Sequence, residues 1–219
     1  MHIEAGYQDR TEAGIALARA LERYRGTRAI AVGMARGGIA VAAALATALQ
    51  LPLVPLIIRK LRAPENPELA LGAISETGEQ WVDYEMMRLT GTTGEYLQSE
   101  LEHQFLEATR LRIAYSGFTG IGAVRDRPAI VVDDGIATGS SALVAVRSVR
   151  GMGAERLVLA TPAASSTALS LLRSEVDEVE ALLAPDVFIA VGAYYHRFDQ
   201  VDDAEVLNFL RRSAEFHQQ

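Results

Sequence analysis

The stretch that most constrains the fold of this chain runs from Ala129 to Val146 and reads AIVVDDGIATGSSALVAV. A short apolar run ends in two adjacent aspartates, a turn of small and hydroxyl residues follows, and an alanine- and valine-rich segment has the pattern of a helix. This order predicts a buried strand, a loop and the N-terminus of a helix. Because adjacent like charges repel, we expect a cation or hydroxyl groups to lie against Asp133 and Asp134.

The rest of the chain alternates between helix and strand patterns. We expect helices over residues 10–24, 38–50, 94–112, 139–151, 165–174 and 203–213, and strands over 28–33, 53–59, 128–133, 156–161, 178–183 and 187–191. Asp202 or Asp203 is placed to cap the last helix. Such alternation is typical of an α/β fold with a doubly wound, mostly parallel sheet, in which ligands bind outside the carboxyl ends of the strands. The loops at these ends are residues 34–38, 60–75 and 133–141.

The composition excludes several kinds of protein. There is no cysteine, which rules out disulfides, thiolate catalysis and cysteine-based metal sites, and the four histidines are scattered. The net charge of −7 argues against a general affinity for nucleic acid. No apolar run reaches the roughly 18 residues that a membrane span needs. We therefore expect a cytoplasmic globular protein, residues 1–219 forming a single domain, without a nucleic-acid or membrane partner.

Two features of the other loops favour an anionic ligand. The segment GMARGG, residues 33–38, places Arg36 and two glycines between a strand and a helix, where backbone N–H groups and the helix N-terminus can approach an anion closely. The chain has twenty arginines but a single lysine, Lys60, which ends the apolar run LPLVPLIIRK. A compact ammonium at this position indicates a preference for a point charge over a planar guanidinium.

The segment VVDDGIATGSS, residues 131–141, resembles the signature of the type I phosphoribosyltransferases, and ARGG, residues 35–38, resembles the pyrophosphate loop of that family. The similarity covers residues 28–162. It implies one phosphoribosyltransferase-like, Rossmann-like domain with its core at 28–162, an insertion or flexible loop at 61–125 and a small C-terminal hood at 176–219. The implied reaction uses phosphoribosyl pyrophosphate and Mg²⁺ to transfer ribose 5-phosphate to a nitrogenous base or another amine, or runs in reverse.

The same resemblance implies roles for individual residues. Asp133 and Asp134 would hold the ribose hydroxyls, directly or through Mg²⁺, and would be catalytic together with Arg36. The pyrophosphate would meet Ala35, Arg36, Gly37, Gly38 and Lys60. In the family the peptide bond matching Ala35–Arg36 is often cis, so we expect a cis bond here, with Lys60 facing it. The 5′-phosphate would lie against Gly135, Ile136, Ala137, Thr138, Gly139, Ser140 and Ser141, where a valine at Gly139 would obstruct it.

The sequence leaves two questions open: which molecule accepts the ribose 5-phosphate, and whether the protein catalyses the transfer or only binds phosphoribosyl pyrophosphate. Hypoxanthine-guanine-type members carry an aspartate where this chain has Ala137, whereas adenine-type members have Ala-Thr-Gly there, as here. Phe188 is either a stacking ring for a base or a core residue. A regulatory protein that binds phosphoribosyl pyrophosphate without turnover is the alternative to an enzyme, and we expect a homodimer in either case. A phosphoacceptor receiver is disfavoured because that fold needs a later lysine and none follows Lys60.

Overall fold

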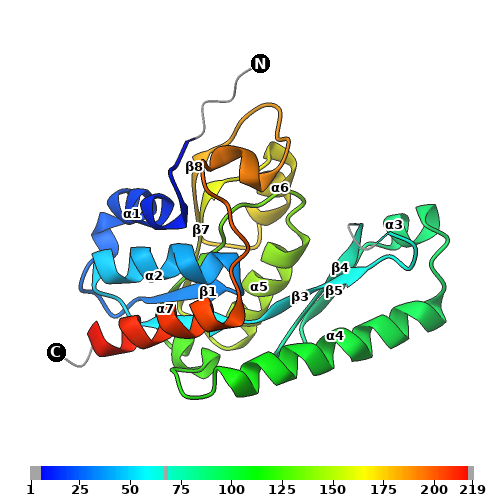
Figure 1. Cartoon of the computed structure of the whole chain (residues 1–219), viewed down its shortest axis with the longest axis horizontal. Coiled ribbons are helices and arrows are strands. Elements are labelled where there is room, and N and C mark those ends of the chain that lie inside the picture. Colours follow the sequence, from blue (N-terminus) through cyan, green and yellow to red (C-terminus); the bar gives the residue numbers. More distant parts are fainter. Residues whose placement is uncertain (1–5, 67–68, 217–219) are drawn as a thin grey trace.

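The computed structural model describes residues 6–66 and 69–216, and its centre is a five-stranded parallel sheet (Figure 1). The strand order is β2-β1-β6-β7-β8, and every neighbouring pair is parallel. The bounds are β1 (Ile30–Met34), β2 (Leu53–Leu56), β6 (Pro128–Val132), β7 (Arg156–Ala163) and β8 (Glu178–Leu183). The predicted α/β, mostly parallel sheet is confirmed.

Helices cover both faces of this sheet, because neighbouring residues of each buried strand point to opposite sides. On β1, Ala31 belongs to a core shared with α1 (Arg10–Ala20), α2 (Gly37–Leu49) and α7 (Asp203–Phe216). Its neighbour Val32 belongs to a second core, shared with α5 (Ser140–Gly151) and α6 (Ser166–Leu172). The sheet is therefore doubly wound, as predicted. Short 3₁₀ turns, η1 (Glu22–Tyr24) and η2 (Ile121–Val124), join these elements.

The chain leaves the parallel sheet at Ile57 and forms a separate antiparallel unit. We call residues 58–114 the arm. It contains β3 (Ile58–Arg62), β4 (Ala70–Ser75), β5 (Gln80–Val82), α3 (Tyr84–Leu89) and the long helix α4 (Gly94–Ala114). The arm projects to one side of the core, toward the right in Figure 1. The strand predicted over 53–59 is thus two strands in two different sheets.

A small apolar cluster holds α4 on the arm's sheet. Leu61, Leu71 and Ile74 are buried there, and Leu97 and Leu101 of α4 pack against them. Phe105, which continues this helical spacing, is 38% exposed and lies outside the cluster. The apolar spacing on α4 therefore serves mainly to fix the helix to the hairpin.

The C-terminal part departs from the sequence prediction at one point. No strand forms over 187–191: Val187 and Ile189 are exposed, and the chain instead turns through η3 (Val191–Tyr194). A short apolar run is not sufficient for a strand when no neighbouring strand pairs with it. We call residues 184–200 the C-terminal loop. Asp202 then caps α7, accepting from the Glu205 N–H at 2.8 Å while Glu205 accepts from the Asp202 N–H.

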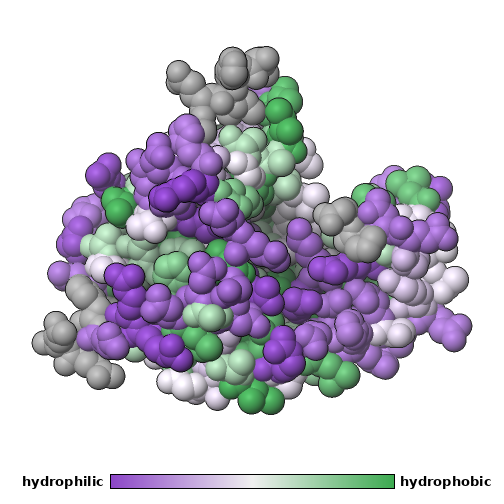
Figure 2. Space-filling model, in the orientation of Figure 1, coloured by the Kyte–Doolittle hydropathy of each residue, from purple (hydrophilic) through white to green (hydrophobic). Residues whose placement is uncertain are grey.

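Polar residues cover most of the visible face of the molecule, with apolar residues scattered among them (Figure 2). Within the described part of the chain, no helix is both long and apolar enough to cross a membrane.

Candidate active site

Two loops meet at the carboxyl ends of the neighbouring strands β1 and β6. The Ala35–Arg36 peptide bond after β1 is cis, as predicted, and Gly37 and Gly38 begin α2 directly behind it. A Cβ atom added to Gly37 would overlap the Asp134 carboxylate, and one added to Gly38 would lie 2.6 Å from the Val132 carbonyl oxygen. The glycines are therefore required for the two loops to touch.

The acidic pair follows β6 at this contact. Asp133 is partly buried, and its Oδ1 accepts a hydrogen bond from the backbone N–H of Asp134 at 2.9 Å. Burial, and then the charge of Asp134, raise the pKa of the Asp133 carboxyl above its usual range, whereas Lys60 acts in the opposite direction. The two carboxylates thus repel each other, and cations offset that repulsion.

The nearest of these cations is Arg10, the first residue of α1. Its Nε donates to Oδ2 of Asp134 at 2.8 Å, and both side chains are largely buried. Its Nη1 donates to the Asp199 carbonyl oxygen at 2.7 Å, and its guanidinium lies over the Phe198 ring, 3.9 Å from the centroid. The cation expected against the acidic pair is therefore Arg10, which precedes Asp134 by 124 positions in the sequence.

Sequence reasoning missed Arg10, although one signal for it exists. Asp9 caps α1 by accepting from the N–H groups of Thr11 and Glu12. A cation directly behind such a cap opposes the helix dipole, so its presence there indicates a partner outside the helix. Tyr195 was missed as well: its hydroxyl donates to the Asp134 carbonyl oxygen at 2.6 Å, and nothing in its sequence context indicates this.

The segment 135–141, predicted to bind phosphate, forms a loop anchored to β7 and α6. The N–H of Ile136 donates to the Ala163 carbonyl, and the Ser165 hydroxyl donates to the Ala137 carbonyl at 2.5 Å. Gly139 has a φ of 89° and stands at the N-terminus of α5. The hydroxyls of Thr138 and Ser140 lie 3.4 Å apart, and the N–H groups of the first helical turn lack intrahelical acceptors. The loop therefore offers several donors to an anion.

A cleft of about 520 Å³ opens between the loop after β1, Asp134, the C-terminal loop and the arm, and residues 135–141 do not line it. Its lining includes the cis bond, Gly37 and Asp134, together with the basic residues Arg10, Arg36, Arg59, Lys60 and Arg62. Lys60 is exposed and faces this cleft, as the sequence predicts. Burial, and then the charge of Arg62, lower the pKa of Arg59, whose Nε donates to Gln104 at 2.9 Å. The cleft concentrates positive charge around one carboxylate.

Arg36 is held from the opposite side by α7. Its Nε lies 2.8 Å from Oδ1 of Asp203, which also accepts a hydrogen bond from the Tyr115 hydroxyl at 3.1 Å. Burial, together with Asp203, raises the pKa of Tyr115 to about 12. Asp203, a candidate helix cap in the sequence, thus fixes the arginine of the first loop instead.

The aromatic ring at the cleft is Phe198 rather than Phe188. Phe188 packs on Tyr194, with ring centroids 5.2 Å apart, in a small apolar cluster. Phe198 lines the cleft and stacks on Tyr195 at 4.9 Å. The C-terminal loop therefore presents a ring to the cleft at a position that sequence reasoning did not select.

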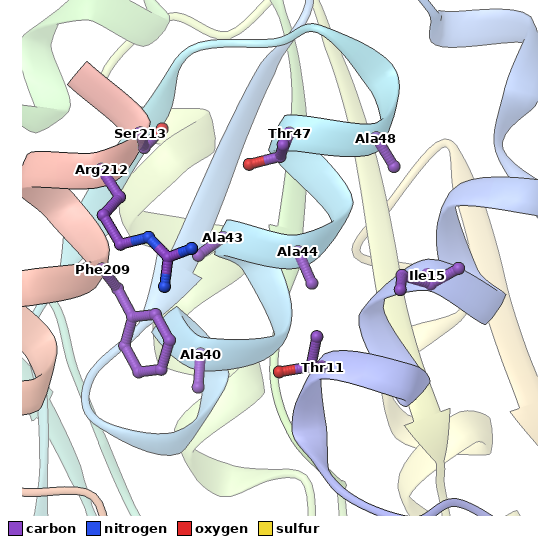
Figure 3. Close-up of a pocket in the computed structure, with 10 residues that line it drawn as sticks. All are labelled: Thr11, Ile15, Ala40, Ala43, Ala44, Thr47, Ala48, Phe209, Arg212 and Ser213. Carbon is purple, nitrogen blue, oxygen red and sulfur yellow. The ribbon is translucent and has the colours of Figure 1, made fainter. Parts of the chain in front are cut away.

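A second hollow of about 330 Å³ lies between α1, α2 and α7, away from both loops (Figure 3). Four of its lining residues are alanines of α2, and Arg212 is the charged side chain among them. It has neither a carboxylate nor a glycine loop. This hollow therefore lacks the groups that the cleft brings together.

Comparison with known proteins gives one family across most of the chain. The family model described as "Phosphoribosyl transferase domain" matches residues 7–198. The chain is similar to a Mycobacterium tuberculosis protein named "Putative phosphoribosyl transferase Rv0571c", with 36% identity over 207 residues that cover 94% of this chain and 47% of that protein. The chain thus spans about half the length of the curated relatives it matches.

Two solved structures resemble this chain over most of its length. The crystal structure of TT1426 from Thermus thermophilus is 36% identical, covers 94% of this chain and 98% of its own, and has a TM-score of 0.76. A hypothetical protein from Neisseria gonorrhoeae with bound ppGpp is 13% identical, covers 94% and 93% of the two chains, and has a TM-score of 0.52. The second likeness concerns the fold alone.

Proposed function

Because the chain belongs to the phosphoribosyl transferase domain family, we propose that it transfers ribose 5-phosphate from phosphoribosyl pyrophosphate to a nitrogenous base or another amine. The observation that carries this proposal is the contact between Gly37 and the Asp134 carboxylate at the mouth of a cationic cleft. That contact brings donors for a pyrophosphate next to acceptors for sugar hydroxyls.

In this proposal each loop binds one part of the substrate. The N–H groups and hydroxyls of residues 137–141 bind the 5′-phosphate, and Asp133 and Asp134 accept hydrogen bonds from the ribose 2′- and 3′-hydroxyls. Arg36, Lys60 and the amides of Gly37 and Gly38 bind the pyrophosphate. The first loop and Asp134 line the cleft, whereas residues 135–141 lie outside its lining, so in this proposal the 5′-phosphate binds beyond Asp134 as seen from the pyrophosphate.

The reaction exchanges one bond at C1 for another. The bond from C1 to the pyrophosphate oxygen breaks, a bond from C1 to the acceptor nitrogen forms, and the acceptor loses a proton. Positive charge develops on the sugar and negative charge on the leaving pyrophosphate. The chain contributes positioning by the two loops and a fixed field from Arg36 and Lys60 that stabilises the departing charge.

The carboxylate oxygens of Asp133 and Asp134 suit a magnesium ion that arrives with the substrate. Mg²⁺ in such sites binds one or two carboxylates and completes its shell from phosphate oxygens and water. Asp134 lines the cleft and Asp133 lies directly before it in the chain, and the described residues contain no cluster of three or more acidic or histidine ligands. The ion would neutralise charge on the pyrophosphate; Asp133 and Asp134 would hold it directly or through the ribose hydroxyls.

The test is a pyrophosphate-release screen with phosphoribosyl pyrophosphate, Mg²⁺ and a panel of purines, pyrimidines and other amines. Turnover with one acceptor supports the proposal and identifies the acceptor. Binding of phosphoribosyl pyrophosphate without turnover across the panel supports a regulatory protein instead, an alternative that Ala137 leaves open. Absence of binding contradicts both. A cytoplasmic location and a homodimer stay predictions.

A further inference from the structure

Arg10 contacts three separate parts of the candidate site. Its guanidinium donates to the Asp134 carboxylate and to the Asp199 carbonyl, and it covers the Phe198 ring. Its Nε would also lie 3.1 Å from a Cβ added to Gly37. With 12% of its side chain exposed, Arg10 is far more enclosed than Lys60, which is exposed in the same cleft.

These contacts hold Asp134 in place at the cleft. Its N–H donates to Asp133, its carbonyl accepts from Tyr195, and its Oδ2 accepts from Arg10. The neighbouring Asp133 carboxyl also interacts with its side chain. Because Asp134 lines the cleft, a carboxylate held in this way is presented to a ligand in one orientation.

The ion pair also removes the main reason for a second cation at Asp134. Two adjacent carboxylates repel each other, and the repulsion falls when one has a permanent positive partner. A guanidinium stays charged at physiological pH, and its separate N–H groups let Arg10 donate to the Asp134 carboxylate and to the Asp199 carbonyl oxygen at the same time. Arg10 therefore supplies, from within the chain, a charge that a divalent ion would otherwise have to supply.

We propose that Arg10 is a positioning residue of the ribose site, a built-in counter-ion of Asp134 that lets ribose 5-phosphate bind without a divalent cation. This inference rests on the proposed function, because it assumes that Asp134 meets ribose hydroxyls. It concerns the sugar subsite alone, so a requirement for Mg²⁺ at the pyrophosphate is compatible with it.

The experiment measures the affinity for ribose 5-phosphate by calorimetry, once with Mg²⁺ and once with EDTA. For the unmodified chain we expect the two affinities to agree within about threefold. For Arg10→Gln we expect the affinity in EDTA to fall about tenfold or more, with Mg²⁺ restoring a part of it. Arg10→Lys keeps the positive charge but loses the planar guanidinium. Its affinity for ribose 5-phosphate should stay independent of metal and fall about threefold. Arg19→Gln, an exposed position on the same helix, is the matched control and should bind as the unmodified chain does.

A double-mutant cycle separates positioning from general support of the fold. In an Asp134→Asn background, Arg10→Gln should have little further effect on affinity, since the charge it balances is already gone. Far-UV circular dichroism and thermal melting verify that each variant folds, and Arg10→Lys keeps the test valid if Arg10→Gln does not fold.

Four outcomes overturn the inference. The first is a loss of about tenfold or more for the unmodified chain in EDTA, and the second is unchanged binding by Arg10→Gln. The third is a metal requirement in Arg10→Lys, and the fourth is an equal loss from Arg10→Gln with and without Asp134. If the unmodified chain binds ribose 5-phosphate under neither condition, the proposed function itself fails, which distinguishes the two failures.

Discussion

Asp133 and Asp134 are adjacent in the sequence but meet different partners. Arg10 holds the side chain of Asp134, and Tyr195 holds its carbonyl oxygen. Asp133 accepts from the N–H of Asp134 and is influenced by the exposed Lys60. The carboxylate of Asp134 is therefore held in place before a ligand arrives, whereas Asp133 lies behind it, outside the lining of the cleft.

Asp134→Asn should weaken the binding of phosphoribosyl pyrophosphate by about tenfold or more, because a neutral amide accepts a weaker hydrogen bond than a carboxylate does. The fold should persist, but the free energy of unfolding should fall by about 1–3 kcal/mol since the buried Arg10 loses its counter-ion. Calorimetry and urea denaturation measure the two effects. Asp126→Asn is the control, because Asp126 has a φ of 57°, which asparagine tolerates. Unchanged affinity in a folded Asp134→Asn protein would contradict the assignment.

The structure changes the reason why Gly139 matters. A Cβ at Gly139 would lie 3.3 Å from Ala168 Cβ and from Leu171 Cδ2, toward α6, so a side chain there would not point directly at a phosphate. The residue's φ of 89° is the stronger constraint. Gly139→Ala should destabilise the fold by about 1–2 kcal/mol and reduce the stabilisation by ribose 5-phosphate.

Thermal melting with and without ribose 5-phosphate measures this change. Gly151→Ala, at the other end of α5 and with open space around it, should be neutral or slightly stabilising. If Gly139→Ala keeps the full stability and the full response to ribose 5-phosphate, the backbone of this loop is not what the site requires.

At the scale of elements, the sequence predicts the parallel core well because β1, β6 and β7 are short apolar runs, each followed by a helix. The prediction fails where strand formation depends on which strands pair. The apolar run continues through Leu56, Ile57 and Ile58, yet the strand breaks at Ile57 because Leu56 pairs with β1 while Ile58 pairs with β4. Residues 187–191 have a strand pattern but no pairing partner. The glycine loop and the acidic pair are local and were predictable, whereas the contact between Arg10 and Asp134 joins residues 124 positions apart.

Glu76 anchors the point where the arm leaves the core. Its Oε1 accepts from the Ile57 N–H at 3.0 Å, and the Ile57 carbonyl accepts from the Glu76 N–H at 3.0 Å. Burial raises the pKa of Glu76 above its usual range, although the hydrogen bond and Arg112 act against this. The folded chain therefore binds this proton more tightly than the unfolded chain does. The stabilising contribution is complete below the unfolded pKa of about 4.3 and is lost as the pH rises through the raised value.

Glu76→Gln should therefore match the unmodified chain near pH 4 and exceed it in free energy of unfolding near pH 8, because glutamine keeps the acceptor oxygen without the charge. Urea denaturation across this pH range measures the difference, with the exposed Glu65→Gln as control. A less stable Glu76→Gln protein at pH 8 would show that the attraction of Arg112 outweighs the cost of burial.

Asp203, the first residue of α7, forms an ion pair with Arg36 of the loop after β1. Asp203→Asn removes the carboxylate that holds Arg36 and adds one unit of positive charge to the cleft region. Because both side chains are about one third exposed, we expect a modest gain, about threefold in the affinity for pyrophosphate. Asp202→Asn, which keeps the helix cap without touching Arg36, is the control for calorimetry. A loss of affinity in Asp203→Asn would show that Asp203 positions Arg36 for the ligand.

At the scale of the whole molecule, positive charge gathers in one cleft of an otherwise acidic protein. The chain has a net charge of −7, yet five basic residues line the cleft around Asp134. The cleft therefore attracts an anion that the rest of the surface repels.

This arrangement predicts a strong dependence on salt. Between about 50 and 500 mM KCl the affinity for pyrophosphate should fall by about tenfold, because the ions screen the charges of the cleft. Calorimetry at several ionic strengths gives the slope, and Arg62→Gln should reduce it, since Arg62 is an exposed member of the basic lining. An affinity independent of salt would contradict binding by these charges.

The position of the arm has a consequence for how the fold can diversify. The chain leaves the parallel sheet after Leu56 of the edge strand β2 and re-enters it at Pro128, the first residue of β6. Strand β1 separates these two points and fixes the register of both neighbours. Residues between them can lengthen, shorten or be exchanged without shifting any pairing in the core. In evolutionary terms the arm is a replaceable insertion: its exchange would alter the cleft wall that carries Arg59, Lys60 and Arg62 while the loops after β1 and β6 stay as they are.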